Sequence, residues 1–123
     1  MKPLFLCYPK CSTCQKAKKF LAENQIAVEE RHIVEDHPQK TELFKWMEQS
    51  QGDPKKFFNT SGLVYREMAL KDKVKTMSPA EMAEILATNG MLVKRPLLIL
   101  EDTVLIGFKE EQWKAALLTN KQD

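Results

Sequence analysis

The sequence has little of several features that would assign it to a special class of protein. Only four glycines, six prolines and three cysteines occur in 123 residues, and there is no low-complexity segment, internal repeat or linker. No apolar run is long enough to span a bilayer, and residues 1–4 lead into a strand-like run instead of a signal peptide. These absences predict a cytoplasmic protein that contacts no membrane and keeps its thiols mostly reduced.

The charged residues are nearly balanced. Nineteen lysines and arginines accompany 17 aspartates and glutamates, which gives a formal net charge of +2. The two signs mostly alternate along the chain, as on a solvated surface, so direct binding to nucleic acid is not expected. The length suits one domain over residues 1–123, with a core large enough to fold without disulfide bonds.

The most informative pattern is a pair of cysteines, Cys11 and Cys14, at the start of a predicted amphipathic helix over residues 15–24. The first turn of a helix has unpaired backbone amides and a partial positive charge, which favour a thiolate over a thiol. Residues three apart on a helix face one another, so the second sulfur lies within reach of a disulfide. Lys10 and Lys16 add positive charge nearby. The pattern predicts a redox pair with Cys11 as nucleophile and Cys14 as resolving thiol.

Three other interpretations of the cysteines are open. A zinc site needs four ligands, and the missing ones would have to come from Cys7, His32 or His37, which show no paired spacing. The spacing of the three cysteines also matches an iron–sulfur cluster, but the radical enzymes that use it are about twice as long or longer. The thiols could also be inert, which we expect of Cys7 because it continues a buried apolar run. The redox pair is the preferred interpretation, with no metal and no bound cofactor.

The hydrophobic pattern around the cysteines predicts a strand, a helix and a second strand. Leu4–Leu6 is the first apolar run, and residues 26–34 form the second strand after the helix. A right-handed crossover between them makes the two strands parallel.

The middle of the chain, over about residues 39–90, is predicted to be a helical insertion. One helix ends at Gly52, and another covers residues 63–70. The clearest helix start is Ser78–Glu81, where an N-cap serine, a proline and a capping-box glutamate coincide. Asn89 and Gly90 close that helix.

After Gly90 the pattern returns to strands. Leu97–Leu100 and Val104–Ile106 are short apolar runs joined by three polar residues, which predicts a hairpin. A last helix over residues 108–118 turns Trp113 inward. The order βαβ, helices, ββα predicts an α/β protein with a mixed sheet, a thioredoxin-like fold with a helical insertion.

Three segments carry a family resemblance. They are Tyr8–Ala17 around the two cysteines, Phe58–Gly62 with Tyr65 and Arg66, and Lys94–Arg95–Pro96 before the hairpin. Together they resemble the arsenate reductase-like family, which includes the Spx-type regulators, and the resemblance covers nearly the whole chain. It implies that Cys11 is the nucleophile, that Cys14 forms a reversible disulfide with it as in Spx-type members, and that Arg95 sits over the nucleophile. It also implies a cis peptide bond before Pro96, which brings this loop against the cysteine motif.

The sequence departs from the glutaredoxin-coupled arsenate reductases that it resembles. Those enzymes have two further arginines near the oxyanion, at places that fall near Asn59 and near Phe108 or Lys109 here. A charge-assisted hydrogen bond is worth roughly 1.5 to 3 kcal/mol, so losing two donors weakens arsenate binding by several kcal/mol. We do not expect efficient arsenate reduction.

Two functions are compatible with these residues. The preferred one is a thiol–disulfide oxidoreductase in which Cys11 attacks, Cys14 resolves the adduct, and thioredoxin or glutathione with glutaredoxin restores the dithiol. The alternative is a Spx-like redox-sensing transcriptional regulator that binds the RNA polymerase α subunit and is switched by the same disulfide. Arg95 holds Cys11 as a thiolate or fixes an anionic substrate, unless it is a plain surface cation.

Overall fold

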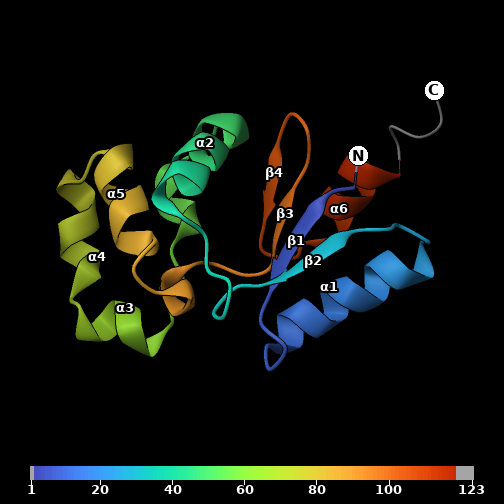
Figure 1. Cartoon of the computed structure of the whole chain (residues 1–123), viewed down its shortest axis with the longest axis horizontal. Helices are drawn as coiled ribbons and strands as arrows, with labels where there is room; N and C mark the ends of the chain where they lie inside the picture. Colours follow the sequence, from blue (N-terminus) through green and yellow to red (C-terminus); the bar gives the residue numbers. More distant parts are fainter. Residues whose placement is uncertain (1, 119–123) are drawn as a thin grey trace.

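The computed structural model describes residues 2–118, and its centre is a four-stranded sheet (Figure 1). The strands are β1 (Leu4–Cys7), β2 (Glu29–His32), β3 (Leu97–Ile99) and β4 (Val104–Ile106), in the order β2-β1-β3-β4. β1 pairs parallel with β2 and antiparallel with β3, and β3 pairs antiparallel with β4. This confirms the predicted mixed sheet, although β2 is shorter than the strand expected over residues 26–34.

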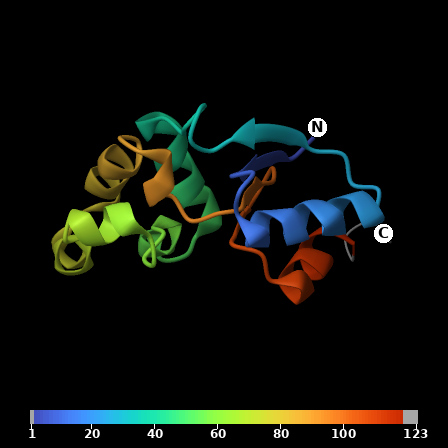
Figure 2. The same cartoon turned by 90° about the horizontal axis from the view of Figure 1, so that it is seen from below.

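Helices cover both faces of the sheet. α1 (Ser12–Glu23) connects β1 to β2, and α6 (Glu110–Leu117) follows β4. Between β2 and β3 the chain forms α2 (Lys40–Ser50), α3 (Leu63–Glu67), α4 (Leu70–Lys73) and α5 (Pro79–Leu86), with short 3-10 helices at Pro54–Phe57, Val74–Thr76 and Gly90–Leu92. Figures 1 and 2 show α2 to α5 gathered on one side of the sheet, with α1 and α6 on the other. The α/β fold with a helical middle is therefore as predicted.

The core has two layers because neighbouring side chains along a strand point to opposite faces of the sheet. Leu6 points toward the helical insertion, whereas Phe5 and Cys7 point toward α1 and α6. The insertion-side layer includes Leu43, Trp46, Met47, Phe57, Leu86 and Leu97. The other layer includes Cys14, Ala17, Phe20, Leu21, Leu98, Leu105 and Trp113. The start of α1, with its cysteines, is thus anchored in the second layer.

Several helix ends differ from the prediction. α2 ends at Ser50, and the residue that takes the left-handed conformation is Gln51, with φ 57°, instead of Gly52. The predicted helix over residues 63–70 is broken at Ala69, whose φ is 53°.

Gly90 has a different role from the predicted one. α5 ends at Leu86, and Gly90 instead opens a 3-10 helix that Asn89 caps. A Cβ atom at Gly90 would overlap the carbonyl oxygen of Ile33, so glycine allows two backbone segments to approach closely here. The capping box at Ser78 and Glu81 is confirmed.

Arg31 stabilises the connection between β2 and α2 through several hydrogen bonds. Its guanidinium donates to the two carboxylate oxygens of Glu42 at 2.7 and 3.0 Å, and to the carbonyl oxygens of Asp36 and His37 at 2.8 and 3.1 Å. Glu42 also accepts a hydrogen bond from the Gln39 amide, which completes a capping box at the start of α2. The hydrogen bond from Arg31 lowers the pKa of Glu42. One carboxylate therefore holds a strand and a helix together.

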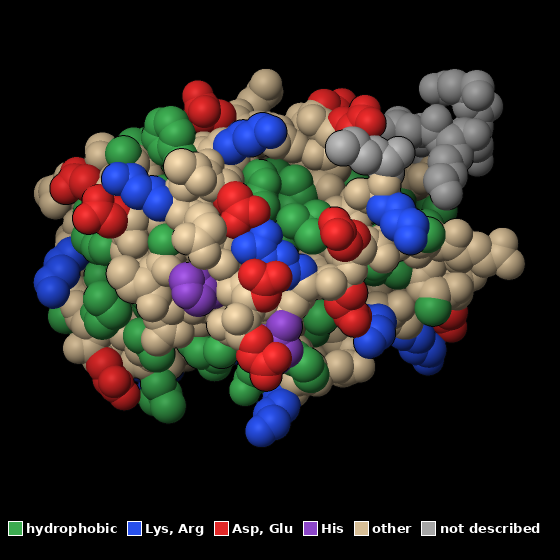
Figure 3. Space-filling model, viewed as in Figure 1, with side chains coloured by type: hydrophobic (Ala, Val, Ile, Leu, Met, Phe, Trp, Pro, Cys, Tyr) green, Lys and Arg blue, Asp and Glu red, His purple; other side chains and the backbone are tan. Residues whose placement is uncertain are grey.

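The surface carries both signs of charge. On the face shown in Figure 3, lysines and arginines are interspersed with aspartates and glutamates, in keeping with the alternation in the sequence. In residues 2–118, no helix combines the length and the hydropathy needed to cross a membrane.

Candidate functional site

Cys11 is the N-cap residue of α1. Its backbone is extended, with φ −90° and ψ 122°, its amide donates to the Tyr8 carbonyl at 3.0 Å, and its carbonyl accepts from the Gln15 amide at 3.1 Å. The helix begins at Ser12, earlier than the predicted residue 15, because the tight turn at Tyr8 leads directly into it. The thiol of Cys11 is half-buried and lies at the positive end of the helix dipole.

Cys14 lies one turn further along and is buried, with 1% of its surface exposed. Its sulfur accepts a hydrogen bond from the Tyr8 amide at 3.3 Å. Its thiol also interacts with the side chains of Cys7 and Cys11. The interaction with Cys7 raises the pKa of Cys14 most, and burial raises it further. The same interaction lowers the pKa of Cys7. In the reduced protein Cys14 is therefore a protonated thiol at neutral pH.

Cys11 lines an open pocket that joins three parts of the chain. The lining residues come from the start of α1, from α3 and the turn before it, and from the segment between α5 and β3: Cys11, Thr13, Asn59, Ser61, Gly62, Leu63, Val64, Met91, Lys94 and Arg95. Neither Cys7 nor Cys14 is among them. The structure thus brings Arg95 to the same pocket as Cys11 and leaves Cys14 behind it.

Arg95 has an unusual environment for a guanidinium. Its Nε and Nη1 atoms are buried and have no hydrogen-bond partner in the described part of the chain. Its Cζ atom lies 5.3 Å from the centre of the Tyr8 ring, in a cation–π contact. The Arg95–Pro96 peptide bond is cis, as the family resemblance implied. A guanidinium held against an aromatic ring, with unpaired N–H groups, is suited to bind an anion at this pocket.

Tyr8 and Cys7 are two contributors to the site that the sequence analysis missed. Tyr8 provides both the amide that contacts Cys14 and the ring beneath Arg95. Its position in the cysteine motif was a usable signal. Cys7 entered the sequence analysis only as a possible metal ligand, and we expected it to be inert. The expected burial of Cys7 is confirmed, at 6% exposure, but its thiol contacts Cys14.

His32 supports the site without lining the pocket. Its Nδ1 accepts hydrogen bonds from the amides of Val34 and Glu35 at 3.2 and 3.0 Å, and its ring meets the Tyr8 ring edge-on at 5.8 Å. A histidine whose Nδ1 accepts two amide hydrogen bonds orders the turn after β2 and positions Tyr8. His37 contacts the carbonyl of the neighbouring Pro38.

The two places where the family resemblance implied further arginines in arsenate reductases are occupied here by shorter or differently placed side chains. Asn59 lines the Cys11 pocket, but its amide group donates to the Met91 carbonyl at 3.5 Å. Lys109 lines a neighbouring pocket that it shares with Lys94. Arg95 is the one arginine that lines the Cys11 pocket within the described chain.

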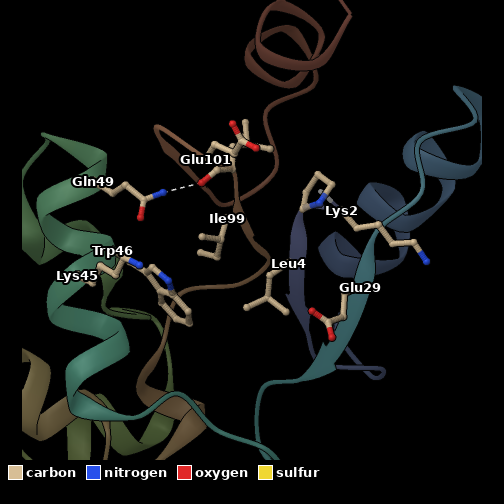
Figure 4. Close-up of a pocket in the computed structure, with 10 residues that line it drawn as sticks. Lys2, Leu4, Glu29, Lys45, Trp46, Gln49, Ile99 and Glu101 are labelled. Atoms are coloured by element: carbon tan, nitrogen blue, oxygen red, sulfur yellow. Dashed lines mark hydrogen bonds between the residues drawn. The ribbon is translucent and has the colours of Figure 1, made fainter.

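A further hollow lies between α2 and the sheet (Figure 4). Trp46 and Gln49 of α2 face Leu4 and Ile99 across it, and Gln49 donates a hydrogen bond to the Leu100 carbonyl. It contains none of the predicted site residues. Within residues 2–118, no group of three or more histidine, cysteine or acidic side chains is arranged to hold a metal ion.

Three features together define a thioredoxin-like protein with a candidate thiol site. The sheet is mixed, a thiol lies at the N-cap of the helix after the first strand, and a loop with a cis-proline lies beside that thiol. The chain belongs to the ArsC family, whose profile matches residues 6–116.

Three similar proteins support this assignment. YusI of Bacillus subtilis strain 168, an uncharacterised protein, is 51% identical over 114 residues, which are 93% of this chain and 97% of YusI. A crystal structure of a protein related to the ArsC family from Bacteroides fragilis is 56% identical and superimposes with a TM-score of 0.89, covering 94% of this chain and 97% of that one. The global transcriptional regulator Spx of Streptococcus agalactiae (serotype V) is 28% identical over 117 residues, covering 95% of this chain and 83% of Spx. The chain is therefore an ArsC-family protein of thioredoxin-like fold with Spx among its relatives.

Proposed function

We propose that this protein is a thiol–disulfide oxidoreductase that uses Cys11 as nucleophile and Cys14 as resolving thiol. The observation that carries the proposal is the arrangement of the two sulfurs at the start of α1. Cys11 opens to a pocket, and Cys14 is buried one turn behind it and hydrogen-bonded to it. This order suits a first attack on an external substrate and a second, internal attack.

The reaction proceeds in two exchange steps. The Cys11 thiolate attacks one sulfur of a substrate disulfide, so that a mixed disulfide forms and the other substrate sulfur leaves as a thiolate. Cys14 then loses its proton and attacks the Cys11 sulfur, which releases the reduced substrate and leaves a Cys11–Cys14 disulfide. Thioredoxin, or glutathione with glutaredoxin, supplies the two electrons that restore both thiols.

Arg95 is the residue that we assign to charge stabilisation in this pocket. A guanidinium with unpaired N–H groups stabilises an anion, either the Cys11 thiolate or a carboxylate of the substrate. Among the described residues Arg95 is the one arginine that lines the pocket, so a disulfide substrate is a better match than an arsenate dianion, which needs several such donors. We further propose that the chain functions as one domain in the cytoplasm.

The test is steady-state reduction of a small disulfide by the full chain. Hydroxyethyl disulfide and arsenate are compared as substrates, each with thioredoxin and its reductase or with glutathione and glutaredoxin. We expect turnover of the disulfide, loss of turnover in Cys11→Ser, and a trapped mixed disulfide in Cys14→Ser. Turnover no faster than that of each reductant system without the chain, or full turnover in Cys11→Ser, would overturn the proposal.

A second function is favoured by the relationship to the transcriptional regulator Spx. In this alternative the Cys11–Cys14 disulfide switches binding to the RNA polymerase α subunit, and the protein has no turnover of its own. The deciding measurement is whether the oxidised and the reduced chain capture the purified carboxy-terminal domain of the polymerase α subunit. Capture that depends on oxidation, without turnover, supports the regulator.

A further inference from the structure

The buried side of the cysteine pair contains a third thiol. Cys7 is the last residue of β1 and points into the same core layer as Cys14. The amide of the next residue, Tyr8, lies 3.3 Å from the Cys14 sulfur, so that sulfur is packed directly against the end of β1. The Cys7 and Cys14 thiols are hydrogen-bonded to each other.

Cys14 is therefore the middle sulfur of three. Its side chain interacts with that of Cys11, which lines the pocket, and with that of Cys7, which lies in the same core layer. All three cysteines are free. Two different disulfides, Cys11–Cys14 and Cys7–Cys14, thus have Cys14 in common.

We propose that Cys7 is a third redox thiol, which exchanges with the Cys11–Cys14 disulfide to form a buried Cys7–Cys14 disulfide. This inference rests on the proposed oxidoreductase function, because Cys11 must first be oxidised together with Cys14. In the exchange, the Cys7 sulfur loses its proton and attacks the Cys14 sulfur. The Cys7–Cys14 bond forms, the Cys11–Cys14 bond breaks, and its electron pair leaves on Cys11, which takes up a proton. No external oxidant or reductant is consumed.

The two disulfides differ in their accessibility. Cys7 and Cys14 are 6% and 1% exposed, so a disulfide between them is shielded from a protein reductant, whereas Cys11 lines an open pocket. Exchange therefore replaces the accessible Cys11–Cys14 disulfide by a buried disulfide and restores Cys11 in the pocket as a free thiol. Reduction of the buried disulfide requires the reverse exchange through Cys11.

Peptide mapping of the full chain can distinguish the two disulfides. Trypsin cleaves after Lys10 and Lys16, so that Cys11 and Cys14 lie in one short peptide and Cys7 lies in the preceding one. A Cys11–Cys14 disulfide stays within one peptide, but a Cys7–Cys14 disulfide joins two. The reduced protein is treated with one equivalent of diamide and quenched with acid at increasing times. It is then unfolded in concentrated urea, alkylated with N-ethylmaleimide, digested and analysed by mass spectrometry.

We expect the disulfide within one peptide to form first and then to decline as the joined peptides accumulate, with the alkyl group on Cys11. The joined peptides should be lost in Cys7→Ser, which keeps a polar group of similar size, while the Cys11–Cys14 disulfide persists. Complete alkylation of Cys7 in the wild type at every time would overturn this inference and leave the proposed function intact. If neither disulfide forms, the proposed function fails, and this inference fails with it.

Discussion

The backbone amide of Tyr8 donates a hydrogen bond to the sulfur of Cys14 over 3.3 Å, across the turn that joins β1 to α1. This contact places the second cysteine of the motif against the end of β1 and directs it away from the pocket. Because the first cysteine remains in the pocket, the two thiols of one short motif have different surroundings. Their chemical behaviour should differ accordingly.

Alkylation should distinguish the thiols by their exposure. In the folded chain we expect iodoacetamide to modify Cys11 about tenfold faster or more than Cys7 or Cys14, because the latter two are buried. The modified residue is identified by fragmentation of the tryptic peptides. The control is the chain in concentrated urea, where all three thiols should react at similar rates. Equal rates in the folded chain would contradict the assignment of Cys11 as the accessible thiol.

The resolving step should depend on pH through Cys14. Because the pKa of Cys14 is raised, only a small fraction is thiolate at neutral pH, and the rate of its attack on a Cys11 mixed disulfide should increase about tenfold per pH unit well into the alkaline range. Release of the substrate thiol from a preformed mixed disulfide measures this rate.

Cys7→Ala provides the matched control for that pH profile. The hydrogen bond to Cys7 is the largest cause of the raised pKa of Cys14, so its removal should lower this pKa and speed resolution at neutral pH. A profile identical to that of the wild type would show that Cys7 does not influence the Cys14 thiol.

Substitution of Arg95 should separate activity from stability. The buried Nε and Nη1 atoms lack partners, and such groups cost about 1 to 3 kcal/mol, so Arg95→Leu should be as stable as the wild type or more stable. Its kcat/KM for disulfide reduction should fall about tenfold or more, because a charge-assisted hydrogen bond contributes roughly 1.5 to 3 kcal/mol. Arg95→Lys keeps the charge and should lose less. If Arg95→Leu keeps the kcat/KM of the wild type, Arg95 does not contribute to the reaction.

The Arg31–Glu42 pair should make folding stability depend on acidic pH. The pKa of Glu42 is lowered in the folded state, so its stabilisation is present above the unfolded value of about 4.3 and is lost as the pH falls through the folded value. Glu42 is about one-third exposed, with a side-chain exposure of 34%, so we expect Glu42→Gln to cost only about 1 kcal/mol at pH 7. Urea denaturation at pH 7 and pH 3 measures the difference, which should be smaller at the lower pH.

The exposed pair of Lys40 and Glu84 is the control for that measurement. Its side chains are 51% and 70% exposed, so Glu84→Gln should change the free energy of unfolding little at either pH. An equal loss of stability in the two variants would mean that the effect reflects overall charge and not the geometry of Arg31.

Gly90→Ala should destabilise the fold strongly. The new Cβ would overlap the Ile33 carbonyl oxygen, so the chain around Gly90 must move away from the segment after β2, and we expect a loss of roughly 2 kcal/mol or more. Thermal unfolding measures the effect. Gly52→Ala is the matched control, because the nearest atom to its Cβ is the Ser50 carbonyl oxygen at 3.9 Å. Equal melting temperatures for the two variants would show that the close approach at Gly90 is not required.

Much of the fold could be predicted from local patterns. The short apolar runs at Leu97–Leu100 and Val104–Ile106 predicted the hairpin, and Ser78 with Glu81 predicted the start of α5, because strand patterns and capping depend on residues close in sequence. Helix ends were less predictable. The glycines at positions 52 and 90 suggested helix ends, but the left-handed residue is Gln51, and Gly90 is needed for contact with a distant segment.

The amino-acid sequence by itself determined the order of strands and helices and the position of Cys11 at the start of a helix, since these depend on neighbouring residues. Only the tertiary structure decided which groups surround that thiol. Arg95 reaches the Tyr8 ring because β3 pairs with β1, and Cys7 meets Cys14 because β1 packs beneath the first turn of α1. These contacts join residues that the local pattern does not relate, so they exist only once the sheet and helices have packed.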